Sequence, residues 1–139
     1  MQQTSHWDLS DQAFSQQFSD CTLDPFLFTH QAHIRLAWIY ITQYGIDVAS
    51  QRLCAEIARF DKVHGDGTKF NMTVTIAAAR AVDHFMRKSN SSDFADFIAQ
   101  SPRLLTNFKD LIGQHYGWNI FADSKAKVSY LEPDLAPFT

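Results

Sequence analysis

The hydrophobic positions of this chain recur with the spacing of α-helices, and polar or helix-breaking residues separate the apolar segments. No segment alternates polar and apolar residues with the period of a β-strand. The pattern predicts helices over 11–20, 29–45, 47–65, 71–88, 93–100 and from 102 onward, with one or two further turns over 124–130. The expected capping residues are Ser10, Thr29, Asp47 and Ser92. The predicted fold is therefore all-α, a single-domain irregular helical bundle of five or six helices.

The second of these helices is the most apolar. Ala32, Leu36 and Ile39 lie on one side of it, and Ile34 and Trp38 lie on the opposite side, so little polar surface remains. A helix that is apolar all round is normally buried. We therefore expect the other helices to pack around this one.

Length and composition narrow the class of protein. At 139 residues, with 45% hydrophobic and 19% charged residues, the chain is expected to form one globular domain over 1–139. The net charge is -3 and Lys and Arg are scattered, which argues against nucleic acid as a partner. There is no apolar run of about 20 residues and no signal-like amino terminus, so no membrane association is predicted and a cytoplasmic location is expected. Cys21 and Cys54 are expected to be reduced, and the composition is compatible with a homodimer.

Candidate chemistry is concentrated at the start of the second helix. His30 and His33 are three residues apart, so both side chains project from one face and could share a ligand. The positive end of the helix dipole lowers the proton affinity of an imidazole, which keeps a neutral ring available as a base or ligand. Two interpretations stay open at this point. The histidines form a functional pair, or each is a structural residue that donates a ring N–H to a carbonyl.

Three further polar residues are candidates for binding a substrate. Arg35 follows the histidines and could pair with Asp24, with Asp66 or with a ligand carboxylate, although an arginine among apolar neighbours is more often a buried structural pair. Lys69 and Thr73, together with Thr75, lie at a junction between loop and helix that could hold an anion. The alternative for that junction is ordinary helix capping and a solvated lysine.

The segment Phe28-Thr29-His30-Gln31-Ala32-His33-Ile34-Arg35-Leu36-Ala37-Trp38 resembles the leading motif of a family of small, uncharacterised bacterial helical proteins. Lys69-Phe70-Asn71-Met72-Thr73-Val74-Thr75 and the tail Glu132-Pro133-Asp134-Leu135-Ala136-Pro137 match further stretches of the family pattern. The second stretch usually reads Lys-Tyr-His-Glu-Thr-x-Thr in the family. The resemblance implies a metal site of histidines and a carboxylate in relatives. In this chain Asn71 and Met72 stand at the histidine and glutamate positions, and neither is a good ligand for zinc or iron.

From these observations we expect no tightly bound metal and no cofactor. A third ligand for the two histidines would have to come from His64, Asp66, Asn71, His84 or His115, and none of these has a spacing that selects it. The leading hypothesis is a small-molecule enzyme with a pocket between the second and fourth helices. His30 and His33 would act there as general acid and base or as partial metal ligands, and Arg35, Lys69, Asn71 and Thr73 would contact the substrate. The alternative hypothesis is a non-catalytic ligand-binding or interaction protein with a degenerate metal site.

Overall fold

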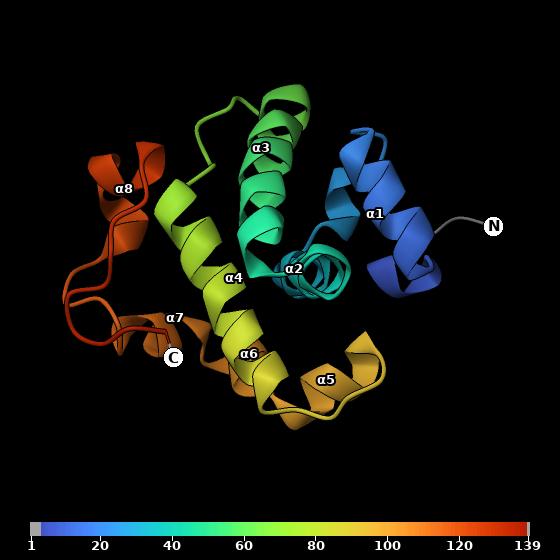
Figure 1. Ribbon diagram of the computed structural model, residues 1–139. Coiled ribbons are helices and arrows are strands. Elements are labelled where there is room, and N and C mark those ends of the chain that lie inside the picture. The colour runs from blue at the N-terminus through green and yellow to red at the C-terminus, as the bar shows by residue number, and fades with distance from the viewer. Residues whose placement is uncertain (1–3, 139) are drawn as a thin grey trace.

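The computed structural model describes residues 4–138, which form one all-helical body (Figure 1). The α-helices are α1 (Asp11–Ser19), α2 (His30–Tyr44), α3 (Ile46–His64), α4 (Met72–Arg87), α5 (Phe94–Gln100), α6 (Arg103–Thr106), α7 (Phe108–Gly113) and α8 (Ser124–Val128). Three 3₁₀ turns accompany them: η1 (His6–Asp8), η2 (Pro25–Leu27) and η3 (Ile120–Ala122). The described residues contain no strand, and five of the α-helices have seven or more residues. The predicted all-α fold class is confirmed.

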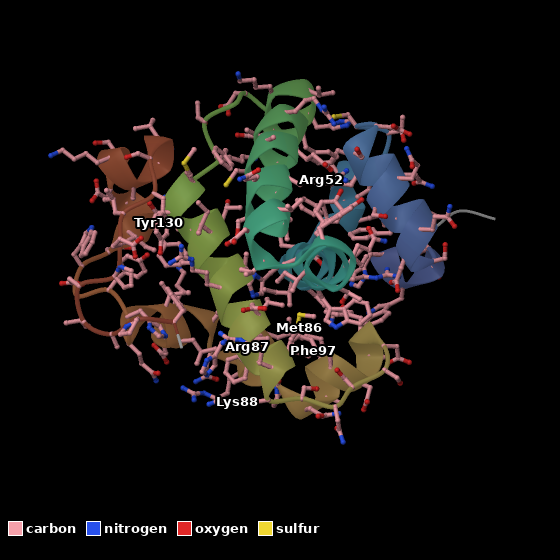
Figure 2. The ribbon with its side chains drawn as sticks, in the orientation of Figure 1. Arg52, Met86, Arg87, Lys88, Phe97 and Tyr130 are labelled. Atoms are coloured by element: carbon pink, nitrogen blue, oxygen red, sulfur yellow. The ribbon has the colours of Figure 1, made fainter. Side chains whose placement is uncertain are left out.

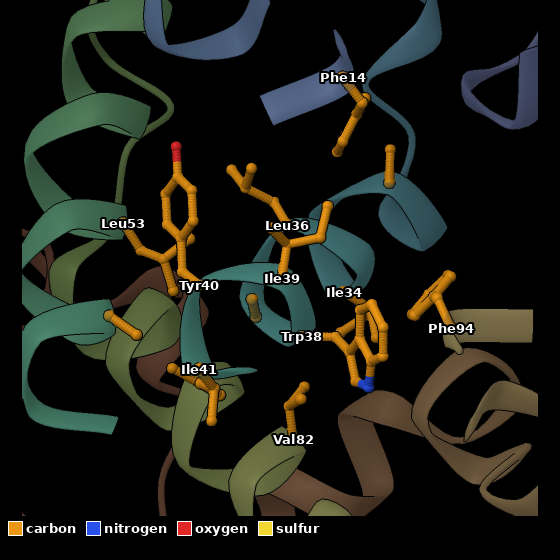
Figure 3. Packing of buried hydrophobic residues seen from close by; sticks show 14 of the residues in the cluster. Phe14, Ile34, Leu36, Trp38, Ile39, Tyr40, Ile41, Leu53, Val82 and Phe94 are labelled. Atoms are coloured by element: carbon orange, nitrogen blue, oxygen red, sulfur yellow. The ribbon is translucent and has the colours of Figure 1, made fainter. Parts of the chain in front are cut away.

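The core is built around α2, as its apolar composition predicts. Figure 1 shows α2 almost end-on, with α1 on one side of it and α3 and α4 on the other. Leu36 and Ala32 are fully enclosed, and Ile34 on the opposite side of the same helix is 1% exposed. Figure 3 shows α2 side chains reaching toward Phe14, Leu53, Val82 and Phe94, which come from four other helices. One helix thus joins the packing of α1, α3, α4 and α5.

Two of the four expected capping residues, Ser10 and Thr29, are confirmed. The hydroxyl of Ser10 accepts a hydrogen bond from the N–H of Ala13, and the hydroxyl of Thr29 accepts one from Ala32. Asn71 caps α4 in the same way, because its side-chain oxygen accepts from Val74. These caps fix where the three helices begin, and two of them lie beside the candidate site.

Three helix boundaries differ from the prediction. Asp47 does not cap α3, because Gly45 turns the chain with a φ of 82° and the helix begins at once at Ile46. Asp93 rather than Ser92 caps α5, its carboxylate accepting from Asp96. The helix expected from 102 onward is divided at Asn107, whose backbone departs from helical geometry with a φ of -132°. The resulting change of direction separates α6 from α7.

The carboxyl-terminal segment is hydrogen-bonded to α4 and to the residues that follow α7. The hydroxyl of Thr73 donates to the carbonyl of Ser129 and accepts from the N–H of Leu131. The ring N–H of His115 donates to the carbonyl of Ala136, and the hydroxyl of Tyr130 accepts from Arg80 on α4. Figure 2 shows Tyr130 beside α4 and far from Arg87 and Lys88 at the other end of that helix. The proline-limited tail is therefore part of the folded body.

Two other features bear on the sequence-based expectations. Among the described helices, none combines the length and the apolar character needed to cross a bilayer.

Cys21 and Cys54 are free thiols and half-buried, and burial raises the pKa of the Cys54 thiol to about 11. A thiol with so high a pKa is almost entirely protonated at neutral pH, so Cys54 is a poor nucleophile.

Candidate functional site

A cavity of about 150 Å³ lies where the first turns of α2 and α4 face α3. We call it the histidine recess, because His30 and His33 both line it, as their spacing predicted. Its other lining residues are mostly apolar and come from α2, α3, the loop before α4, α4 itself and α7: Ile34, Ala37, Leu53, Ile57, Lys69, Phe70, Asn71, Val74, Thr75, Ala78, Ala79 and Phe108. The recess is thus an apolar cavity with a few polar groups at one end, which is the usual construction of a small-molecule site.

His33 is the most unusual group in this recess. Its ring stacks on Phe28, with ring centroids 3.8 Å apart, and the rest of it is open to the recess. Among residues 4–138, none makes a hydrogen bond to either ring nitrogen. Surrounding protein desolvates the ring, and the nearby His30 adds repulsion, so that the pKa of His33 falls to about 4. At neutral pH His33 is therefore an uncharged imidazole that can both donate and accept a hydrogen bond.

His30 is held more firmly than His33. Its Nε2 lies 2.9 Å from the carbonyl oxygen of Leu104, so Nε2 carries the proton and donates it to that oxygen. The ring also packs against Phe108, with centroids 4.8 Å apart. In the neutral form its Nδ1 is left as an acceptor. The sequence left open a structural role in which a histidine donates a ring N–H to a carbonyl. Nε2 of His30 has that role.

Lys69 and Asn71 join the two histidines at the recess, as the sequence-based hypothesis expected. The backbone N–H groups of Lys69 and Phe70 both donate to the carboxylate of Asp61, which fixes the loop before α4. Among the described residues, no carboxylate lies within ion-pair distance of the Lys69 ammonium. Asn71 is more constrained, since it caps α4 with its oxygen and donates from its nitrogen to the carbonyl of Ile120.

Arg35 is not at the recess, which corrects the expectation that it contacts a substrate there. It lies two residues beyond His33, and at about 100° per residue its side chain leaves the opposite side of α2. The guanidinium donates to the carbonyl oxygens of His6 and Leu9 and to the carboxylate of Asp11. Its acidic partner is therefore Asp11, and the expected pairing with Asp24 or Asp66 was wrong. With 4% of its surface exposed, Arg35 is a buried structural residue that holds the amino-terminal segment.

Thr73 also lies away from the recess. Its side chain is fully buried, and both of its hydrogen bonds go to the carboxyl-terminal segment, as described above. The physical reason is again helical geometry, because Thr73 is two residues before Thr75 in α4 and its side chain leaves the other side of the helix. Thr75 does line the recess, with its hydroxyl donating to the carbonyl of Asn71.

A second cavity, of about 250 Å³, adjoins the first and is called here the outer recess. The two cavities share His33, Ile57, Lys69 and Phe70 as lining residues. The outer recess adds Pro25, Phe28, Phe60, Asp61, His64 and Gly65. His64 is engaged there, since its Nε2 donates to the carbonyl of Cys21 at 2.7 Å. His33 and Lys69 thus stand between an inner apolar cavity and a more polar outer one.

The donor set for a metal ion is incomplete within the described part of the chain. No three His, Cys, Asp or Glu side chains of residues 4–138 come together in a group that could hold an ion. The position at which the family pattern has a histidine is nonetheless at the recess, because Asn71 lines it together with His30 and His33. The two segments therefore meet at the recess, although their side chains in this chain are not those of a metal site.

Comparison of the chain with protein-family models, with curated proteins and with solved structures found no match. The case for a function therefore rests on the recess itself.

Sequence reasoning missed the residues that shape the recess. Phe28 was quoted in the motif but given no role, although it covers one face of His33. Leu53 and Ile57 form the wall on α3, and Ala78 forms part of the wall on α4. Their signal in the sequence is that of ordinary apolar helix positions, which cannot distinguish a residue that lines a cavity from one that fills the core.

Proposed function

We propose that this protein binds a small molecule in the histidine recess and that His33 makes the main polar contact with it. The observation that carries the proposal is the recess itself, an apolar cavity lined at its polar end by His33, whose solvent-accessible ring makes no hydrogen bond with residues 4–138. An imidazole that lines a cavity and makes no hydrogen bond within the protein can donate to and accept from a molecule bound in that cavity. The apolar walls formed by Ile34, Leu53 and Val74 would contact the body of that molecule.

Acid–base catalysis on the bound molecule is the second candidate function, and one observation favours it. A pKa of about 4 keeps His33 unprotonated across the physiological range, so the ring can always accept a proton. The same low pKa makes it a weak base, because a general base works best when its pKa is near the working pH. Binding is therefore the better-supported function, and turnover would require a substrate that itself raises the pKa of His33.

The experiment that tests binding uses benzyl alcohol as the probe. It has a compact ring for the apolar walls and one hydroxyl for His33, and a cavity of roughly this volume accepts a benzene-sized molecule. We expect a titration followed by NMR to shift the resonances of His33 and of recess residues. His33→Phe retains a ring that can stack on Phe28 and removes the polar contact, so binding should weaken.

Ala78→Leu provides the blocking variant, because Ala78 is half-buried at the recess and a larger side chain there occupies the cavity. Ala99→Leu is the matched control, since Ala99 is exposed on α5 and the substitution is chemically identical. Binding should be lost in the first variant and retained in the second. If Ala78→Leu binds the probe as well as the parent protein does, or if the parent shows no binding, the proposed site is wrong.

A further inference from the structure

The histidine recess lies at the amino ends of two helices at once. His30 and His33 belong to the first turn of α2, while Asn71 and Thr75 belong to the cap and first turn of α4. Each of these helices has at least 15 residues, so each presents the positive end of a full helix dipole. A helix amino terminus favours a negative group. The polar end of the recess lies beside two such termini, and the rest of the recess runs along the sides of both helices as far as Ala37 and Ala79.

The side chains around the recess also favour a negatively charged ligand. No aspartate or glutamate lines it, and Lys69 is the one lining residue with a full positive charge at neutral pH. The Lys69 ammonium has no carboxylate partner within ion-pair distance among the described residues. Asp61, the nearest acidic residue lining the adjoining outer recess, accepts two backbone hydrogen bonds from the loop. Lys69 is exposed, and its charge also lowers the pKa of Asp66, which does not line the recess. A cation at the edge of a cavity that no acidic residue lines favours an anion.

The rest of the recess restricts the anion to a small one with an apolar body. The cavity measures about 150 Å³, and beyond the polar end its walls are side chains such as Leu53, Val74 and Ala79. A single lysine matches a single negative charge. Phosphate groups are usually held by arginines or by a glycine-rich loop, and neither lines this recess.

We propose that the ligand of the histidine recess is a small apolar monocarboxylate, with its carboxylate between Lys69 and His33 and its hydrocarbon part against α3 and α4. This inference rests on the proposed binding function and adds the chemical class of the ligand. Neutral His33 donates one ring N–H to the carboxylate, and Lys69 supplies the opposite charge. The carboxylate in turn stabilises the protonated form of His33, so the bound ligand raises the pKa of that ring.

The test compares benzoate with benzyl alcohol, two probes with the same ring that differ in charge. We expect the parent protein to bind benzoate more tightly than benzyl alcohol at pH 7. Lys69→Gln should weaken benzoate binding about tenfold, the effect of losing one charge-assisted contact, and should change benzyl alcohol binding less than about twofold. Lys88→Gln is the matched control, because Lys88 is exposed at the opposite end of α4 (Figure 2) and the same charge is removed.

A second measurement follows His33 directly. NMR titration of its ring with pH, in the presence and absence of saturating benzoate, should show a higher pKa for the bound protein, and benzyl alcohol should produce no such shift. Lys69→Gln should need about tenfold more benzoate than the parent protein to reach the same pKa shift, because it binds the carboxylate more weakly. Lys88→Gln should need the same concentration as the parent.

The outcomes separate this inference from the proposed function. If benzyl alcohol binds in the recess but benzoate binds no better, or if Lys69→Gln binds benzoate like the parent protein, the monocarboxylate inference is overturned and the binding function stands. Tighter binding of phenyl phosphate than of benzoate would also overturn it, in favour of a dianion. If neither benzoate nor benzyl alcohol binds, both proposals fail.

Discussion

Arg35 and His33 are two residues apart on the same helix, and the fold uses them in opposite ways. Every strong contact of Arg35 is internal, because its guanidinium joins α2 to the carbonyl oxygens of His6 and Leu9 and to Asp11. His33 has a ring-stacking partner but no hydrogen bond to its nitrogens from the described residues. At the scale of single residues, a structural role and a candidate binding role can thus be assigned from the hydrogen-bond partners of each side chain.

The internal role of Arg35 leads to a stability prediction. Arg35→Ala leaves two buried carbonyl oxygens without their charged donor, and hydrogen bonds to charged groups contribute about 1.5–3 kcal/mol each. We expect the free energy of unfolding to fall by on the order of 3 kcal/mol in urea denaturation. Arg103→Ala, at an exposed position on α6, should change it by less than about 0.5 kcal/mol. Equal effects of the two substitutions would contradict the structural role of Arg35.

At the scale of elements, the important relation is between α2 and α4. The caps Thr29 and Asn71 start the two helices so that their first turns meet at the histidine recess. Asn71 therefore occupies a position from which a better ligand could reach the same cavity as His30 and His33. This arrangement can be tested by adding a metal ligand there.

Asn71→His is expected to create a zinc site of three imidazoles, a ligand set that zinc accepts. The substitution removes a helix cap and should cost about 1 kcal/mol without metal. Zinc at a hundredfold excess over its dissociation constant should then stabilise the folded variant by about 2.7 kcal/mol, which raises the melting temperature by several degrees. The parent protein and the double variant Asn71→His/His33→Ala should respond little. A similar zinc response in all three proteins would mean that position 71 and the histidines do not converge.

The pH dependence of stability belongs to the whole molecule, because it sums groups on distant segments. Burial and the neighbouring Arg35 lower the pKa of His6, although its bond to Gln31 opposes this, and burial lowers the pKa of His33 to about 4. For both residues the unfolded chain, with an ordinary histidine pKa near 6.5, binds protons more readily than the folded protein. Their effect on stability therefore depends on pH only below about 6.5.

We expect the free energy of unfolding to be highest above pH 6.5 and to decrease as the pH falls from 6.5 toward 4. Below about pH 4 His33 adds no further loss, and protonation of Asp8, Asp66 and Asp123, whose pKa values are lowered by hydrogen bonds, continues the decrease. Urea denaturation at pH 7.5, 6.0 and 5.0 measures the first of these effects. In His33→Phe the decrease over this range should be smaller, and an unchanged slope would show that His33 is not desolvated as described.

The sequence by itself determined the features that depend on residues only a few positions apart. Period and capping residues placed α1 and α2 correctly, since Ser10 and Thr29 act on backbone groups only three residues away. Period alone placed the start of α4 near Asn71. The three-residue spacing of His30 and His33 likewise placed both side chains on one face. Where the outcome depended on backbone conformation that the pattern does not encode, the prediction failed, as it did for the expected cap at Asp47 and for an unbroken helix across Asn107.

Only the tertiary structure decided which polar residues belong to the candidate site. Arg35 and Thr73 stand in the same motifs as His33 and Asn71, but the segments packed against the other sides of α2 and α4 bind their side chains. The partners Asp11 and Ser129 are 24 and 56 residues away in sequence, and no local pattern encodes such contacts. The low pKa of His33 has the same origin, because desolvation arises from all the protein around the ring, including Phe28 and the walls of α3 and α4. Spacing along a helix fixes the direction of a side chain, whereas what it meets there depends on the packing of the whole chain.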